Sequence, residues 1–257
     1  DPNLQNIPIR TPEGRAIRKA FIPASDQHVL LAADYSQVEL RIAAALSQDA
    51  GLVEAFIQGM DIHTATAAKV FAVSPDEVDR AMRSKAKAVN FGILYGQGAF
   101  GLAQNLSIPR REAKEIIEAY FEQFKDLKQF TANCVESVRE KGYAETVMGR
   151  RRYLPDIQSN NATVRAFAER NAVNAPIQGS AADIIKVAMV RVDKALKAAD
   201  LKSRMIMQVH DELVFDVLLE EVEAVEKLVK TAMVDAVTIS VPLVVDMSTG
   251  KDWLEAH

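Results

Sequence analysis

Two aspartates, Asp34 and Asp211, each lie at the end of an apolar segment that is typical of a buried strand. If both strands belong to one sheet, the two carboxylates come close together although they are far apart in the sequence. Two neighbouring carboxylates raise each other's pKa unless a cation lies between them, and Mg²⁺ is usually held by one or two carboxylates plus substrate phosphates. The pattern therefore indicates a divalent-metal site. The alternative is that both are turn aspartates that cap a loop or a helix.

A second group of candidate residues, Arg83, Lys87, Phe91 and Tyr95, recurs every four positions. On a helix each residue is rotated by only about 40° from the previous one, so the four form a stripe about 18 Å long. Its first half is cationic and its second half is aromatic, which matches the anionic tail and flat base of a nucleoside triphosphate. The alternative is a solvated basic turn followed by two core aromatics. His63 is an isolated ring, which alone favours a surface or cap residue.

Two more sets of polar residues are less specific by themselves. Glu39 and Arg41 lie on the helix expected after Asp34, where the carboxylate is able to bind a metal, pair with a cation or face water. A row at helical spacing carries donors suited to base edges or sugar oxygens; it consists of Arg170, Asn174 and Gln178.

The composition is that of a globular protein, with 49% hydrophobic and 26% charged residues among 257. No apolar run reaches the roughly 18 residues of a membrane helix, which argues against an integral membrane protein. Cys134 is the only cysteine, so an intrachain disulfide is excluded. The net charge of −4 disfavours a polyanionic partner, but local basic clusters leave nucleic-acid binding open. The chain begins at Asp1, and we expect a processed or excised piece of a longer protein.

Apolar periodicity and turn residues predict the elements that must position these groups. Strands are expected at 28–34, 204–209, 213–218 and 241–246, with two short extended pieces around Gly149. Helices are expected at 37–47 and from Ser74 to about Met82 or beyond, followed by a second helical stretch that ends at Tyr95. Further helices are expected at 109–122, 126–140, 162–174, 180–199 and 220–236. Because the strands lie at the two ends of the chain, we predict an α+β domain with an inserted helical subdomain.

Three segments in fixed order resemble the signature motifs of family A DNA polymerases. They are DYSQVELR (Asp34–Arg41), RSKAKAVNFGILYG (Arg83–Gly96) and QVHDE (Gln208–Glu212). DPNLQNIP at the start, GRRRYLPD (Gly149–Asp156) and NAPIQGSAADIIK (Asn174–Lys186) resemble further blocks of the bacterial DNA polymerase I branch. The resemblance covers essentially the whole chain. Val38 stands where isoleucine is common in the family, a change that we expect to be silent.

The resemblance implies a palm with an antiparallel sheet, at residues 1–60 and 156–257, and helical fingers inserted at residues 61–155. It implies metal ligands at Asp34, Asp211 and the Tyr35 carbonyl, with Lys87 as a further catalytic residue. The residues implied at the nucleotide are Gln37, Glu39, His63, Arg83, Lys87, Phe91 and Tyr95, with Glu39 as a steric gate against a ribose 2′-hydroxyl. The residues implied at the primer–template are Asn3, Gln5, Arg170, Asn174, Gln178 and His210.

The function that the resemblance implies is template-directed DNA synthesis by two-metal nucleotidyl transfer, with two Mg²⁺ ions, or Mn²⁺ in their place. The expected partners are primer–template DNA, deoxynucleoside triphosphates and a thumb and exonuclease portion on a separate or removed chain, without a membrane. A cytoplasmic, nucleoid-associated bacterial protein is implied, with an organelle or a phage as the other origins. The rival hypotheses are a two-metal nuclease and a catalytically idle DNA-binding fragment.

Overall fold

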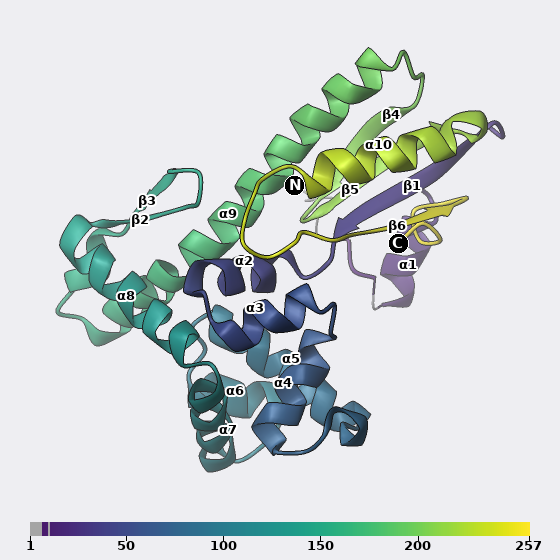
Figure 1. The fold of residues 1–257 in the computed structure, drawn as a ribbon. Helices are drawn as coiled ribbons and strands as arrows, with labels where there is room; N and C mark the ends of the chain where they lie inside the picture. The colour runs from purple at the N-terminus through teal and green to yellow at the C-terminus, as the bar shows by residue number, and fades with distance from the viewer. Residues whose placement is uncertain (1–6, 10) are drawn as a thin grey trace. The chain divides into compact units, whose positions relative to one another are not determined.

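The computed structural model of the protein describes residues 7–9 and 11–257, and Figure 1 shows the order of its elements. The strands are β1 (His28–Tyr35), β2 (Tyr143–Glu145), β3 (Arg151–Tyr153), β4 (Arg204–Val209), β5 (Glu212–Leu218) and β6 (Val245–Gly250). The helices are α1 (Pro12–Arg18), α2 (Val38–Ser47), α3 (Ala50–Ile57), α4 (Ile62–Phe71), α5 (Arg80–Leu94), α6 (Ala99–Leu106), α7 (Arg110–Gln123), α8 (Lys125–Lys141), α9 (Ala162–Ala198) and α10 (Val222–Val234). Short 3₁₀ turns are η2 (Pro75–Glu77), η3 (Pro155–Gln158) and η4 (Leu219–Glu221).

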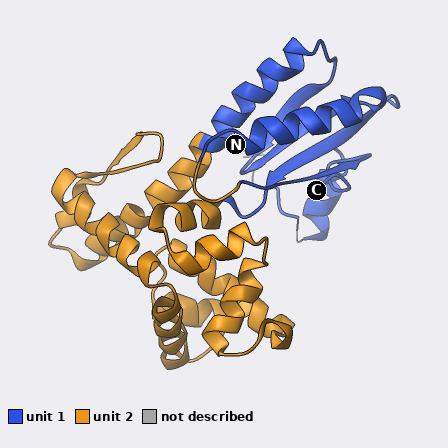
Figure 2. Ribbon diagram, viewed as in Figure 1, with its two compact units in different colours: residues 1–38, 184–238, 243–257 blue, residues 39–183, 239–242 orange. Residues whose placement is uncertain are grey.

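The chain divides into two compact units, which Figure 2 distinguishes by colour. Unit 1 comprises residues 1–38, 184–238 and 243–257, and unit 2 comprises residues 39–183 and 239–242. The sheet of β4, β5, β1 and β6 belongs to unit 1, whereas unit 2 is mainly helical. The predicted palm and fingers boundaries at residues 60 and 155 remain a prediction.

The sheet of unit 1 has the strand order β4-β5-β1-β6, and every neighbouring pair is antiparallel. This confirms the predicted α+β fold with an antiparallel sheet formed by distant segments of the chain. Strand β1 lies in the interior of the sheet and reads as a nearly continuous apolar run, HVLLAADY. Such a run is typical of a strand that is covered on both faces.

Alternate residues of β1 pack on opposite faces of the sheet. Leu30 and Ala32 pack with Trp253 in one buried cluster. On the other face, the Tyr35 hydroxyl donates a hydrogen bond to the Met233 carbonyl of α10 at 2.6 Å. The end of β1 is therefore anchored to a helix, which holds the residues around it in place.

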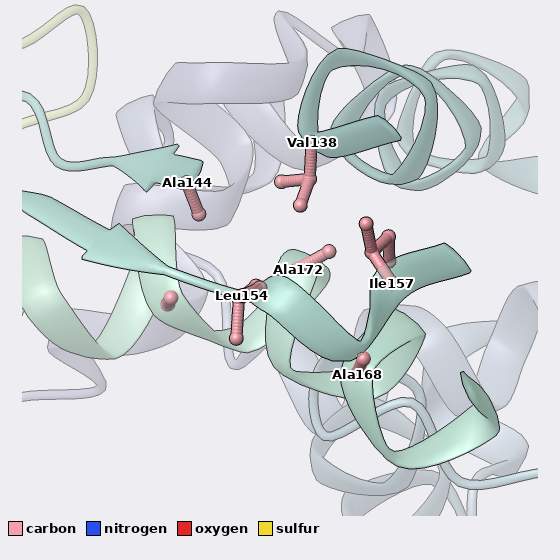
Figure 3. Packing of buried hydrophobic residues seen from close by; sticks show 7 residues of the cluster. Val138, Ala144, Leu154, Ile157, Ala168 and Ala172 are labelled. Atoms are coloured by element: carbon pink, nitrogen blue, oxygen red, sulfur yellow. The ribbon is translucent and has the colours of Figure 1, made fainter. Parts of the chain in front are cut away.

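Unit 2 contains a separate core where α8, the β2–β3 hairpin, η3 and the first half of α9 meet (Figure 3). Alanines allow the backbone of α9 to approach closely, and the hairpin turns at Gly149, which has a φ of 78°. The cluster consists of Val138, Ala144, Leu154, Ile157, Ala168, Ala172 and Ala175.

Residues 162–198 form one helix, so the prediction of two helices separated around Pro176 and Gly179 was wrong. A proline within a helix removes one backbone hydrogen bond and costs about 3 kcal/mol. Here Pro176 is buried, as are Ala172 and Ala175 on the same stretch of the helix. The Ser180 hydroxyl also donates a hydrogen bond to the Pro176 carbonyl. Burial of this helix face outweighs the local preference for a break.

Two other predicted boundaries were wrong. The capping box of Ser74 and Glu77 is present, but it begins only the short η2; Asp79 then caps α5 by accepting from the Met82 amide at 2.7 Å. The last strand is Val245–Gly250 rather than 241–246. Alternating burial of Val241, Leu243 and Val245 shows why 241–246 resembled a strand, because a burial pattern does not specify a pairing partner.

Candidate active site

Unit 1 brings Asp34 and Asp211 together at one end of its sheet. Asp34 is the residue of β1 directly opposite Glu212 in β5 and Asp246 in β6. Asp211 lies in the two-residue turn that joins β4 to β5, and its carbonyl accepts from the Tyr35 amide at 3.3 Å. Both aspartates are half-buried. The predicted convergence of the two strand-end carboxylates is present in the fold.

The electrostatics of this end of the sheet favour a cation. Burial, followed by the nearby charges of Asp211 and Glu212, raises the pKa of Asp34 from 3.8 to about 7. Burial also raises the pKa of Asp211. Among the described residues, no three His, Cys, Asp or Glu side chains converge on a metal position. The two carboxylates lie close enough for Asp211 to raise the pKa of Asp34, and a cation bound between them would relieve this repulsion. Two carboxylates are also a typical protein ligand set for Mg²⁺ or Mn²⁺, whose other ligands are water and substrate phosphate oxygens.

Glu212, whose role is not evident from the sequence, lies opposite Asp34 and next to Asp211. It is only 3% exposed, accepts a hydrogen bond from the Trp253 indole at 2.8 Å and pairs with the His257 ring. The pairing raises the pKa of His257. A buried carboxylate is costly without such partners, so Trp253 and His257 fix Glu212, the residue directly after Asp211. The position of Glu212 in QVHDE was the only sequence signal.

The raised pKa predicts an unusual effect of Asp34→Asn on stability in the absence of metal. The folded state binds the Asp34 proton more tightly than the unfolded state, so its contribution to stability is fully present below the ordinary pKa of 3.8, falls as pH rises above that value, and is lost once pH has risen through the folded pKa of about 7. Above that pH the asparagine variant should be the more stable protein, by about 1–3 kcal/mol after solvent screening is allowed for.

Urea unfolding in EDTA, measured from near pH 3.8 to above pH 7, checks the prediction. The exposed Asp26→Asn variant is the control. We expect the stability difference between wild type and Asp34→Asn to grow with pH and the control difference to stay constant. Equal pH dependence in all three proteins would contradict the electrostatic assignment.

In unit 2, helix α5 carries the predicted stripe. Arg83 and Lys87 are exposed, Phe91 is half-buried and Tyr95 is 40% exposed, so the interpretation of the two rings as core aromatics was wrong. The rings of Phe91 and Tyr95 are stacked, with centroids 6.3 Å apart and an interplanar angle of 21°. Tyr95 is the C-cap residue of α5, and Gly96 follows with a φ of 65°. The stripe is therefore accessible along its whole length.

Asp61, whose role is not evident from the sequence, binds the cationic end of the stripe. It caps α4 by accepting from the His63 amide, and it binds the Arg83 guanidinium at 2.5 Å. Burial would raise the pKa of Asp61, but the hydrogen bonds from Arg83 and Thr64 outweigh burial and lower it to about 2. An aspartate directly before a helical segment is a recognisable capping signal.

His63 lies beside the stripe and is buried, with 4% exposure. Its ring centroid is 5.8 Å from that of Phe91. Taken by itself, His63 favoured a surface or cap residue rather than a ligand; the ring does not lie on the surface, because α4 packs against α5 at this point.

Glu39, on the first turn of α2, is paired with the aromatic end of the stripe. The Tyr95 hydroxyl donates to the Glu39 carboxylate at 2.7 Å. A long acidic side chain is thereby held beside the ring that ends α5. This is the geometry that a steric gate requires, since a fixed side chain excludes volume better than a mobile one.

The remaining predicted residues lie in several places. Arg170 and Gln178 are exposed on α9, whereas the side-chain oxygen of Asn174 between them is buried with no hydrogen-bond partner among the described residues. Gln37 and His210 of unit 1 both have positive φ, of 54° and 55°, which is uncommon for residues other than glycine. Asn3 and Gln5 lie outside the described residues.

The backbone around Gly96 approaches α9 closely within unit 2. A β-carbon added at Gly96 would lie 2.8 Å from Cγ of Arg170, and its φ of 65° also disfavours other residues. Gly96 therefore lets the end of α5 pass next to Arg170.

Comparison with known proteins gives consistent results. The family model described as DNA polymerase family A matches residues 1–255. DNA polymerase I of Lactococcus lactis subsp. lactis is 54% identical over 257 residues, and that of Bacillus subtilis is 53% identical over 256. Each match covers 100% of this chain but 29% of the relative, so the chain spans less than a third of their length.

A solved structure, described as the POL domain of Pol1 from M. smegmatis in complex with DNA primer-template and dNTP, is also similar to this chain. The two share 51% sequence identity with a TM-score of 0.95, over 99% of this chain and 45% of the other. Within the described part of this chain, no helix has the length and apolar character needed to span a membrane.

Proposed function

The chain belongs to DNA polymerase family A, and we propose that it carries out template-directed addition of deoxynucleotides to a primer 3′ end. The observation that carries this proposal is the solvent-accessible stripe on α5, cationic at one end and aromatic at the other. A nuclease that uses two carboxylates and metal ions on water has no need of such a stripe. A DNA-binding module without activity has no need of the carboxylate pair.

In unit 1, Asp34, Asp211 and the Tyr35 carbonyl would hold the metal ions, and the two carboxylates supply the hard oxygen ligands that Mg²⁺ prefers. When bound, two such ions lower the pKa of the primer 3′-hydroxyl and neutralise charge on the leaving pyrophosphate. The anchoring of Tyr35 to α10 and of Glu212 to Trp253 keeps both ligand-bearing segments fixed.

In unit 2, Arg83, Lys87 and His63 bind the triphosphate, with Gln37 of unit 1 as a further contact. The Lys87 ammonium also donates a proton to the pyrophosphate as the bond to the α-phosphorus breaks. Phe91 and Tyr95 flank the sugar and base, and Glu39 excludes a 2′-hydroxyl. Charge-assisted contacts to phosphate and a stacking surface are what a nucleotide of this polarity needs.

The primer–template would contact Arg170, Asn174, Gln178 and His210, and also Asn3 and Gln5. The related solved structure contains primer-template DNA and dNTP, which supports these partners. The relatives are more than three times as long as this chain, which is consistent with a thumb and an exonuclease-like portion in the complete polymerase. In this proposal, the palm comprises residues 1–60 and 156–257, and the fingers comprise residues 61–155.

Arg83→Ala and Lys87→Ala should each weaken nucleotide use, because each removes a charge-assisted contact to phosphate worth about 1.5–3 kcal/mol. Pre-steady-state incorporation should show a higher apparent Kd for the nucleotide, a lower maximal rate, or both, with a combined loss of about 10–100-fold. DNA affinity should change little.

Lys85→Ala is the matched control, because Lys85 is on the same helix but binds Glu112 at 3.3 Å. It should leave nucleotide use near the wild-type value. If Lys85→Ala is as harmful as Lys87→Ala, the effect is one of general charge and the stripe is not a binding surface.

A further inference from the structure

Two buried hydrogen bonds connect α4 to α5 and end on His63. Thr66 and Asn90 are 0% exposed and His63 is 4% exposed. The Thr66 hydroxyl donates to Oδ1 of Asn90 at 3.2 Å, and Nδ2 of Asn90 donates to Nδ1 of His63 at 3.1 Å. Burying an amide and a hydroxyl is unfavourable compared with an apolar pair of the same size unless both are hydrogen-bonded. Packing alone does not call for these side chains here.

The geometry points to Asn90 as a positioning residue that fixes His63 in the tautomer with its proton on Nε2, where the ring donates a hydrogen bond to a phosphate of the bound nucleotide. This inference rests on the proposed function, which places His63 at the triphosphate. An amide nitrogen only donates, so the Nδ1 atom that it binds must accept. In a neutral imidazole the proton is then on the other nitrogen.

Thr66 binds the other end of the Asn90 amide. In the structure, the amide oxygen of Asn90 faces the Thr66 hydroxyl, and its amide nitrogen faces the His63 ring. The opposite orientation would place Oδ1 against Nδ1 of His63 and favour a proton there, leaving a lone pair on Nε2. A lone pair next to a phosphate oxygen is repulsive, so the orientation of one buried amide decides whether His63 attracts or repels the nucleotide.

The charges around His63 make the tautomer important. Burial, and after it the cations Lys87 and Arg83, lower the pKa of His63 to about 4, against the opposing effect of Asp61. The ring is therefore neutral at physiological pH. A neutral ring with a fixed Nε2 proton provides a phosphate contact that does not vary with pH in the physiological range.

Imidazole nitrogen NMR of the full 257-residue chain measures the tautomer without any assay of activity. The four histidines are distinguished by a His63→Gln variant. We expect a protonated Nε2 and an unprotonated Nδ1 for His63 at neutral pH. A proton on Nδ1 would overturn the inference.

Asn90→Asp provides the functional test, because the introduced carboxylate accepts a hydrogen bond from Nδ1 instead of donating one. The pKa of His63 should rise by about one to two units, and the neutral ring should carry its proton on Nδ1. Nucleotide KM should then increase as pH rises through the new pKa, whereas the wild-type value shows no such step. The backbone amide spectrum verifies that the variant is folded.

The two readouts separate this inference from the proposed function. A protonated Nε2 in a chain that does not use deoxynucleotides would contradict the proposed function and leave the tautomer assignment supported. If the pKa and tautomer change in Asn90→Asp while nucleotide KM stays flat with pH, His63 does not donate to the nucleotide and the functional part of the inference is wrong.

Discussion

Asp34→Asn or Asp211→Asn should reduce nucleotide incorporation by roughly three orders of magnitude or more while primer–template affinity stays nearly intact. Each change removes a negatively charged oxygen ligand, and metal-mediated stabilisation of the transition state is worth several kcal/mol, with every 1.36 kcal/mol equal to a factor of ten in rate. DNA is bound mainly through phosphate contacts elsewhere. Single-turnover incorporation and a DNA-binding titration measure the two quantities separately.

Asp246→Asn is the matched control for this prediction. Asp246 is directly opposite Asp34 in the neighbouring strand, but its side chain is exposed and no catalytic role is assigned to it. It should retain most of the wild-type rate. If Asp246→Asn lost as much activity as Asp34→Asn, the incorporation rate would depend on the total negative charge at this end of the sheet and not on two specific metal ligands. Equal losses of rate and DNA affinity would contradict the metal assignment.

Glu39→Ala should raise incorporation of ribonucleotides relative to deoxynucleotides by about a hundredfold, or on the order of 3 kcal/mol of discrimination. The fixed carboxylate occupies volume beside the aromatic end of the stripe, where the nucleotide sugar lies in the proposed orientation. Exclusion by volume fails when the volume is removed, whereas a lost attractive contact would weaken both substrates. The ratio of kcat/KM for matched ribo- and deoxynucleotides is the quantity to measure.

Two variants separate volume from hydrogen bonding at the gate. Glu39→Gln keeps the volume and an acceptor oxygen for the Tyr95 hydroxyl, so discrimination should remain high. Tyr95→Phe keeps the ring but removes the hydroxyl that holds Glu39, and it should give an intermediate ratio. An unchanged ratio in Glu39→Ala would show that Glu39 is not the gate.

The sequence predicted the site best where chemistry and secondary-structure period coincide. Asp34 and Asp211 lie at the ends of apolar runs, and a strand brings the residues around its end to a defined end of the sheet. Arg83, Lys87 and Phe91 recur at helical spacing, and α5 does present them along one side. In both cases local periodicity fixes the direction in which a side chain points.

Features that depend on contacts between distant segments were not predicted. The continuous helix through Pro176 is stabilised by packing in unit 2 that no local preference shows. Asn90 lies between Val89 and Phe91 in the sequence, and nothing in that order shows that its amide meets Thr66 and His63. A burial pattern identifies the side chains that leave water, but it does not specify what they meet.

Single-turnover extension of a primer by one nucleotide tests the central claim most directly. It should be measured with the chain alone and with the chain joined to the N-terminal portion of its Bacillus subtilis relative, so that a weak grip on DNA is distinguished from missing chemistry. We predict addition of the deoxynucleotide that matches the template, dependent on Mg²⁺ and lost in Asp34→Asn. Shortening of the primer, no addition in either form, or addition that persists in Asp34→Asn would contradict the account.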